Sequence, residues 1–473
     1  MAKNDKIIQD IMQKVQKSYD QAKPLSTTDK ADRVVAHPVL GLLIFFGVMW
    51  AIFYLSQITL GPWLAGLLET GMGMIGGAIE IGLDELGAGP LLKGFILDGV
   101  WGGFTAVLSF LPLIMVLFFF LQLLEDSGYM TRVSMVIDRY FAKIGLGGKS
   151  AIPMFVGLAC SVPGVMAART IEDETQRKMT VMLTPFVPCG AKLPVIVLLL
   201  GVFFTGQAWV TALMYIAAIL VVFVIGFALK LFFGLKTSPE KTVYDLPDYK
   251  RPSLELGWRM MLAEAKSFIK NAGTIIVVLN GLVWFFISFD FSLSPVGPEA
   301  SMLRTLAIPF EWALTPIGIA SWGLAVAAIL GFIAKEEIVG ALAVIYVFSV
   351  SDAFDAINII NARDALVTGA SLTALTAISY TVFNLFSPPC FATIGAMKTE
   401  LKSTRWLVFA VGLQLLTGFF FAMWVYQVGH FIVNGSPGQG FLVSLVLTAS
   451  LLGVMIGGAL YHQNSSKEKA IHP

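Results

Sequence analysis

Apolar runs of about twenty residues alternate with short polar segments along most of this 473-residue chain. A helix needs about 20 predominantly apolar residues to cross the hydrocarbon core of a bilayer. Ten segments approach or exceed this length, and they are residues 39–60, 98–124, 179–204, 209–235, 268–289, 316–334, 337–350, 366–396, 406–432 and 440–461. The pattern predicts an all-α polytopic membrane protein with about ten transmembrane helices.

Glycine and proline interrupt some of these apolar stretches. Residues 150–168 are apolar, contain Gly and Pro, and have basic residues at both ends. Because cytoplasmic loops collect Lys and Arg, both ends are expected inside, and this piece is predicted to be re-entrant. The run 366–396 is long and is broken at Pro388-Pro389. Broken and re-entrant helices are therefore part of the expected fold.

Residues 64–83 are the apolar stretch that we expect not to cross the membrane. Glu69 and Glu80 bracket it closely. Ionisable side chains are expensive inside a bilayer. A short segment on the outer side is the resulting expectation.

Loop charges orient the predicted spans. Lys and Arg gather in residues 1–38 and 236–270, whereas the loops near 80–97, 290–311 and 351–364 lean acidic. Basic loops stay in the cytosol, so both termini are expected to be cytosolic.

The two halves of the chain share a faint repeat. In each half an acidic pair at a helix end precedes a Pro-Cys helix break, at Pro188-Cys189 and at Pro389-Cys390. Paired interrupted helices in two halves point to the binding site of a transporter. The expected parts are a cytosolic amphipathic lead helix (1–38), a first gate half (39–235), a cytosolic linker loop (236–267), a second gate half (268–461) and a cytosolic tail (462–473).

Composition narrows the class of protein. The chain is 56% hydrophobic and only 13% charged, with a formal net charge of +1, so a nucleic-acid partner is not expected. Three cysteines in this length do not form a disulfide framework. The run Gly147-Gly148-Lys149-Ser150 resembles only the tail of a phosphate-binding loop, without the first glycine or a preceding strand. We expect a cytoplasmic turn there and no nucleotide site.

All three cysteines, Cys160, Cys189 and Cys390, lie near prolines inside apolar stretches. Proline removes a backbone donor and breaks or kinks a helix. Such breaks are tolerated at membrane depth where they are buried in protein or line a wet cavity. A thiol beside freed carbonyls suits a soft or borderline metal ion. The alternative is that these cysteines are small buried hydrophobes beside ordinary kinks.

Glu336 and Glu337 fall between two apolar runs. At membrane depth such carboxylates mark an ion path or a proton relay. The alternative is a hairpin tip in cytoplasmic water, and the sequence leaves both interpretations open.

Several motifs together resemble the gate regions of the bacterial ferrous iron transporter B (FeoB) family. The first region is carried by Gly157-Leu158-Ala159-Cys160-Ser161-Val162-Pro163 and by Pro185-Phe186-Val187-Pro188-Cys189-Gly190. The second is carried by Ala334-Lys335-Glu336-Glu337-Ile338-Val339-Gly340 and Pro389-Cys390. The likeness runs from about Asp32 to Arg405.

The resemblance implies import of Fe²⁺ across the cytoplasmic membrane, with Fe²⁺ as substrate and no covalently bound cofactor. It implies a transporter rather than an enzyme, and candidate metal ligands at Cys160, Cys189, Cys390, Glu336 and Glu337. Family members usually begin with a cytosolic GTP-binding domain and a regulatory domain, and this chain starts where those would end. The expected partners are the lipid bilayer and a separate GTPase acting in trans, and the sequence leaves open whether the protein forms a homo-oligomer.

Other functions remain open at this point. The chain could carry another divalent metal, or a nucleoside-like solute, because gate regions of this kind also resemble segments of nucleoside permeases. A nucleoside site needs polar side chains that bond a base or ribose, and the candidate sites are poor in them. A membrane receptor that only docks a GTPase would not need broken helices at membrane depth.

Overall fold

A computed structural model describes residues 32–35, 37, 39–141, 145–204, 207–233, 249–346, 359–446 and 448. Over these ranges the chain forms helices joined by turns, and its extended pairing is one isolated bridge between Phe289 and Pro295. The all-α prediction is confirmed for this part of the chain. Most of the expected lead helix (1–38), most of the linker before Tyr249, the far part of the 440–461 run and the 462–473 tail lie outside the described residues.

Helices of the first half are separated by several short 3₁₀ and π segments. They are α3 Leu40–Phe53, η1 Tyr54–Thr59, α4 Leu60–Glu85, α5 Pro90–Gly94, η2 Phe95–Trp101, α6 Gly102–Asp126, α7 Tyr129–Phe141, η4 Gly148–Ser150, α8 Ala151–Ala159, α9 Ser161–Ala167, η5 Ala168–Thr170, α10 Glu174–Leu183, η6 Thr184–Phe186, η7 Gly190–Lys192, α11 Leu193–Gly201 and α12 Ala208–Phe233.

The helices of the second half follow the linker. They are α13 Leu254–Phe268, η8 Ile269–Gly273, α14 Thr274–Ser288, η9 Pro298–Ala300, α15 Met302–Leu314, η10 Thr315–Ile317, α16 Trp322–Ile333, α17 Glu337–Tyr346, α18 Ile359–Gly369, α19 Ala374–Phe386, α20 Phe391–Leu401 and α21 Thr404–Asn434.

Five helical segments among the described residues are long and apolar enough to cross a membrane, and seven if each of two bent pairs counts as one. The five are Leu40–Glu85, Pro90–Asp126, Glu174–Gly201, Trp209–Leu231 and Thr404–Asn434. The bent pairs are Met302–Ile317 with Trp322–Ile333, and Arg363–Gly369 with Ala374–Leu401. The expected number of ten spans is not confirmed, because several of the predicted runs form bent or short helices.

Residues 64–83 differ from the expected short outer segment. They belong to α4, which continues α3 and η1 as a helical run of 46 residues. Such a run is about 70 Å long at 1.5 Å per residue, more than twice the thickness of a hydrocarbon core. Glu69 and Glu80 are both exposed on its surface, so neither carboxylate interrupts the helix.

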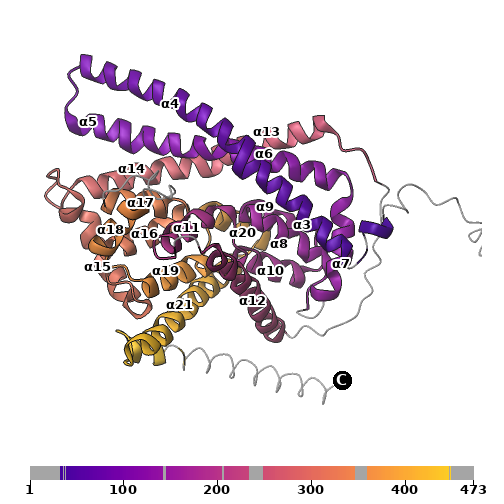
Figure 1. The fold of residues 1–473 in the computed structure, drawn as a ribbon. Coiled ribbons are helices and arrows are strands. Elements are labelled where there is room, and N and C mark those ends of the chain that lie inside the picture. The colour runs from indigo at the N-terminus through magenta and orange to yellow at the C-terminus, as the bar shows by residue number, and fades with distance from the viewer. Residues whose placement is uncertain are drawn as a thin grey trace, which may run out of the picture.

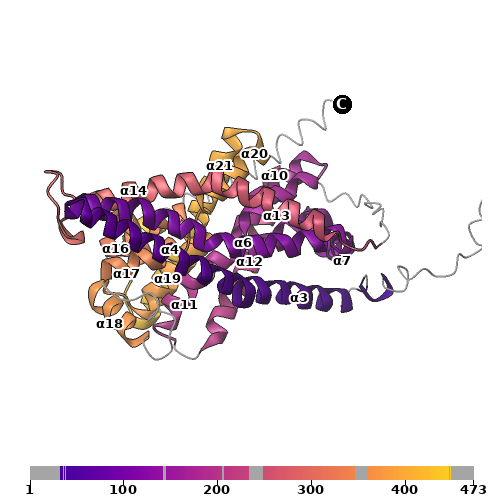
Figure 2. The ribbon, with the colours of Figure 1, turned by 90° about the horizontal axis from the view of Figure 1, so that it is seen from above.

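A long hairpin of α4 and the α5–α6 segment projects from the body of the molecule (Figure 1). Helices α13 and α14 run along this hairpin in both views (Figures 1 and 2). Close approach needs glycine here, because an ideal Cβ on Gly103 would lie 2.9 Å from Cβ of Asn280. Large apolar side chains such as Trp63, Met74 and Ile81 are exposed on α4. An apolar outer surface of this kind fits lipid rather than water.

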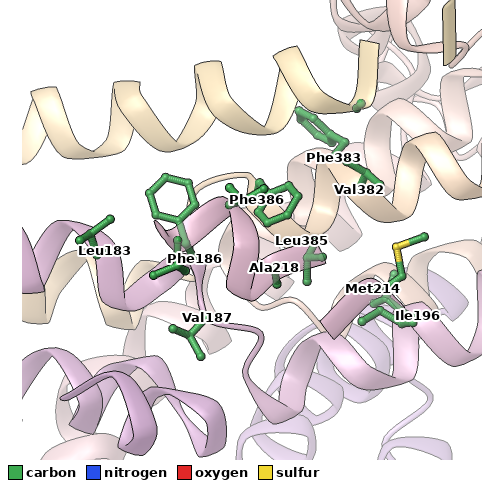
Figure 3. Close-up of a cluster of buried hydrophobic side chains, with 14 of the residues drawn as sticks. Leu183, Phe186, Val187, Ile196, Met214, Ala218, Val382, Phe383, Leu385 and Phe386 are labelled. Carbon is green, nitrogen blue, oxygen red and sulfur yellow. The ribbon is translucent and has the colours of Figure 1, made fainter. Parts of the chain in front are cut away.

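The body consists of short, broken helices packed between longer ones. Helices α8, α9, α11, α16, α19 and α20 lie at its centre, while α12 and α21 extend from it (Figure 1). Phe186 of the first half and Leu385 and Phe386 of the second belong to one cluster of buried apolar side chains (Figure 3). The two halves therefore share one core, and their helix breaks are held within it.

Candidate functional site

The first helix break lies at Cys160. Helix α8 ends at Ala159 and α9 begins at Ser161, and Cys160 between them is extended with φ −150° and ψ 130°. The two helices fold back on each other so closely that a Cβ on Gly164 would lie 2.8 Å from the backbone N of Gly157. The predicted interruption of residues 150–168 at the cysteine is confirmed.

The second break lies at Pro188-Cys189. The chain leaves η6 at Phe186, runs extended and re-enters a helical turn at Gly190, and Cys189 is 9% exposed. A Cβ on Gly190 would lie 3.3 Å from the carbonyl oxygen of Ala159. The backbones of the first and second breaks are therefore neighbours.

The third break separates α19 from α20. Ser387 and Cys390 are both extended at its two ends, and the Cys390 Sγ lies 3.2 Å from Oγ1 of Thr393. Helix α21 passes directly over it, since a Cβ on Gly418 would lie 2.7 Å from the backbone N of Ser387. The predicted interruption at Pro388-Pro389 is confirmed.

The fourth break contains Lys335 and Glu336. Ala334 is extended with φ −148° and ψ 135°, close to the values at Cys160. Lys335 is 3% exposed, and its Nζ donates a hydrogen bond to Oγ of Ser387 at 2.9 Å. Glu336 and Glu337 are half-buried. Because Lys335 is enclosed in the core, this segment is not a hairpin tip in water.

The predicted ligands gather in one region. Cys160 lies within electrostatic range of Cys189, Cys390 and Glu336, and Cys390 within range of Cys189 and Glu336. Glu337 lies within range of Glu336. However, no three His, Cys, Asp or Glu side chains in the described ranges are arranged to hold one metal ion. The five residues share a region without forming a single coordination sphere in this conformation.

Two polar residues of this region were not among the predicted ligands. Lys192 is 1% exposed, and its Nζ donates to the carbonyl oxygens of Pro185 at 3.0 Å and Leu385 at 2.6 Å. Asn384 is 2% exposed, and both of its amide atoms lack a hydrogen-bond partner among the described residues. The sequence alone could have singled out Lys192, because a charged residue inside the apolar run 179–204 marks a functional position.

A second buried charged cluster joins three parts of the chain away from the breaks. Arg132 of α7 is fully buried, and it donates to the carboxylate of Asp32 at 2.8 Å. Its guanidinium lies 3.9 Å from the ring centroid of Tyr249. Burial raises the pKa of Tyr249, Asp32 acts in the same direction, and Arg132 opposes the rise. Arg132 thus connects the lead segment and the linker to the helical body.

Two protein families match this chain. Residues 107–203 and 269–404 match the Gate family, described as nucleoside recognition. Residues 211–263 match the family described as ferrous iron transport protein B C terminus. The matched residues include all four helix breaks.

Curated relatives align with most of the chain. It is 35% identical over 418 residues to the Fe(2+) transporter FeoB of Staphylococcus aureus, covering 86% of this chain and 60% of the relative. It is 30% identical over 407 residues to the same-named protein of Synechocystis sp., covering 85% and 63%. The corresponding protein of Methanocaldococcus jannaschii is 29% identical over 445 residues, covering 90% and 62%. The chain thus spans about three fifths of the length of these relatives, and no solved structure matches it.

Proposed function

Because the chain belongs to the FeoB family and matches its membrane core, we propose that it imports Fe²⁺ across the cytoplasmic membrane through the region where its helices break. The observation that carries this proposal is the gathering of Cys160, Cys189, Cys390 and Glu336 at the breaks of both halves. Oxygen-preferring ions such as Mg²⁺ and Ca²⁺ do not favour thiolates, whereas a borderline ion such as Fe²⁺ accepts them. The substrate proposed is therefore a transition-metal ion.

The three thiols act as successive stations along a path rather than as one binding site. This part of the proposal is supported by the described arrangement, in which no three such side chains surround a single point. Conduction requires sites that bind strongly enough to admit an ion and weakly enough to release it. Stations with one thiolate each meet that requirement. Glu336 and Glu337 contribute negative charge at one end of the path.

Charge balance makes proton loss part of the mechanism. Lys192 and Lys335 are both buried in this region, and each lies within electrostatic range of Cys189 and Cys390. Their positive charges would repel an entering cation if the thiols stayed neutral. Metal ligation requires thiolates, so Fe²⁺ binding releases protons. The thiolates formed on binding then offset the two lysines.

Control by a cytosolic GTPase is the second part of the proposal. The resemblance to the FeoB family implies a cytosolic GTP-binding domain that acts with this membrane core. We expect that domain, supplied as a separate chain, to dock on the cytosolic side where Arg132 holds the lead segment and the linker together. To shift the gate, the GTPase must bind the open and closed states with different affinities.

A nucleoside-like solute is the alternative substrate. It is supported by the description of the matching Gate family and by the amide of Asn384, which has no partner within the described ranges and could bond a base. The cysteines would then have no role as ligands.

Reconstitution into vesicles separates these substrates. The purified chain is placed in proteoliposomes, and uptake of radioactive Fe²⁺ is compared with uptake of Mn²⁺, Mg²⁺ and labelled uridine. Saturable Fe²⁺ uptake that excess Mg²⁺ does not inhibit supports the proposal. Uridine uptake without Fe²⁺ uptake contradicts it. Adding a soluble FeoB-type GTPase with and without GTP tests the second part, which fails if the Fe²⁺ flux is indifferent to both.

A further inference from the structure

Prolines free two backbone carbonyls at facing helix ends. In a helix, a carbonyl accepts a hydrogen bond from the N–H three or four residues later. Three residues after Pro185 stands Pro188, and three and four residues after Leu385 stand Pro388 and Pro389. Proline has no N–H. The Leu385 carbonyl therefore lacks both of its possible helical hydrogen-bond donors, and the Pro185 carbonyl lacks one of its two.

Lys192 supplies the missing donors. Its Nζ reaches both carbonyl oxygens, at 3.0 Å for Pro185 and 2.6 Å for Leu385. Pro185 belongs to η6 at the end of α10, and Leu385 to the last turn of α19 in the other half. One side chain thus connects the ends of two broken helices, and its acceptor in the second half lies 193 residues from Lys192 in sequence.

The position that the amine fills has the chemistry of a monovalent-cation site. Helix C-termini carry partial negative charge. In transporters with broken helices, unwound carbonyls and half-helix C-terminal ends coordinate Na⁺. Here the position is enclosed, since Lys192 is 1% exposed. Cys189 and Cys390 lie within electrostatic range as further electron-rich groups. The ammonium of Lys335 also lies within range of Lys192, and as a like charge it opposes their attraction.

We propose that Lys192 is a built-in cation that occupies a carbonyl-lined monovalent-cation site between the two halves. The side chain replaces a dissociable Na⁺ or K⁺, so the protein neither binds nor needs such an ion there. An ammonium offers three N–H donors, and two of them satisfy the carbonyls of Pro185 and Leu385. If the chain transports Fe²⁺ as proposed above, that transport is not driven by a Na⁺ gradient through this site.

The test measures thermal unfolding of the full chain in detergent and requires no iron. Wild type, Lys192→Ala and Lys192→Gln are compared in choline, sodium and potassium chloride at equal ionic strength. Lys192→Ala opens the carbonyl-lined position, whereas Lys192→Gln fills most of it with a neutral amide donor. Because the readout is stability, a failure of Fe²⁺ transport would leave this result unaffected.

The expected melting temperature of wild type is the same in all three salts. Lys192→Ala is expected to melt lower in choline and to recover in Na⁺ or K⁺, by about 1–2 °C for each tenfold rise in concentration above Kd. Lys192→Gln is expected not to respond to the cation. If Lys192→Ala can be purified only when Na⁺ or K⁺ is present, that dependence supports the proposal equally. A Lys192→Ala protein that is indifferent to the cation, or that fails to fold in every salt, overturns it, as does a wild type that requires Na⁺.

Discussion

Arg169 and Glu400 form an ion pair across 231 residues of sequence, with 2.9 Å between Nη2 and Oε1. Arg169 lies in η5 directly after α9, and Glu400 lies near the end of α20. The Glu400 side chain is 9% exposed and that of Arg169 is 56% exposed. The pair therefore joins the helix after the first cysteine break to the helix after the third.

A double-mutant cycle on this pair should give a small but measurable coupling. Because Arg169 is half in solvent, screening limits the interaction to about 0.5–1 kcal/mol. Arg169→Gln, Glu400→Gln and the double variant are compared by thermal unfolding at low and high salt. The coupling should shrink as salt rises. If the stability losses of the two single variants simply add up in the double variant at both salt concentrations, the ion pair contributes no coupling energy between the halves.

Loss of Arg132 should be among the most damaging single changes outside the breaks. Its guanidinium is fully buried against Asp32 and the Tyr249 ring. Removing one partner of a buried pair leaves an uncompensated charge and costs about 3–5 kcal/mol. Asp32 is 20% exposed, so Arg132→Met should lie at the lower end of that range. The measurement is the shift in unfolding midpoint of the purified chain.

Arg259 offers the matched control. It pairs with Glu255 four residues earlier on α13, and both side chains are about three quarters exposed. Arg259→Met should therefore change stability by about 0.5 kcal/mol or less. If both arginine variants lose equal stability, burial of Arg132 is not the cause.

Two glycine substitutions test the close packing at the first break. A Cβ on Gly164 would lie 2.7 Å from the carbonyl oxygen of Pro153. Overpacking against backbone costs about 1–3 kcal/mol, so Gly164→Ala should be destabilised by at least that amount. Gly47 in α3 has nothing within 4 Å of its Cβ position. Gly47→Ala should therefore leave stability unchanged or raise it by up to about 1 kcal/mol, since alanine favours helix. A Gly164→Ala protein as stable as wild type would mean that α8 and α9 are not packed this closely.

Metal binding should release protons and weaken as pH falls. Thiols ligate only after losing their protons, so acid competes with Fe²⁺ for each cysteine. Anaerobic calorimetry in two buffers of different ionisation enthalpy should give binding enthalpies that differ in proportion to the protons released. Cys189→Ser should reduce that proton release. Equal enthalpies in both buffers would exclude thiolate ligation.

Three of the four helix breaks could be predicted from sequence because their cause is local. A proline removes a donor wherever it stands, so interruptions near Cys160, Cys189 and Cys390 follow from the residues beside them. The membrane class follows similarly from the length of the apolar runs. The number of spans could not be derived in this way. Whether α15 and α16 make one bent crossing or two separate helices depends on packing between distant segments.

The polar contacts between segments distant in sequence were also beyond local inference. The Lys192 amine donates its second hydrogen bond to the Leu385 carbonyl, and the Lys335 amine donates to the Ser387 hydroxyl. Periodicity places each lysine on a helix end but does not say which distant carbonyl or hydroxyl it meets. The continuous helix through residues 64–83 was missed for another reason. The acidic residues Glu69 and Glu80 suggest segment ends in the sequence, although exposed carboxylates do not interrupt a helix.

The most direct measurement of the central claim is Fe²⁺ uptake by proteoliposomes that contain either wild type or a variant with Cys160, Cys189 and Cys390 all replaced by serine. Both proteins are reconstituted at equal density under reducing conditions, and Met154→Leu beside the first break is the control variant. Loss of a metal ligand should cost at least the 10- to 100-fold that outer-shell changes usually cost. We therefore expect uptake by the triple variant to fall about tenfold or more, with the control near wild type. Equal uptake by wild type and the triple variant would contradict a path for iron through the cysteine-bearing breaks.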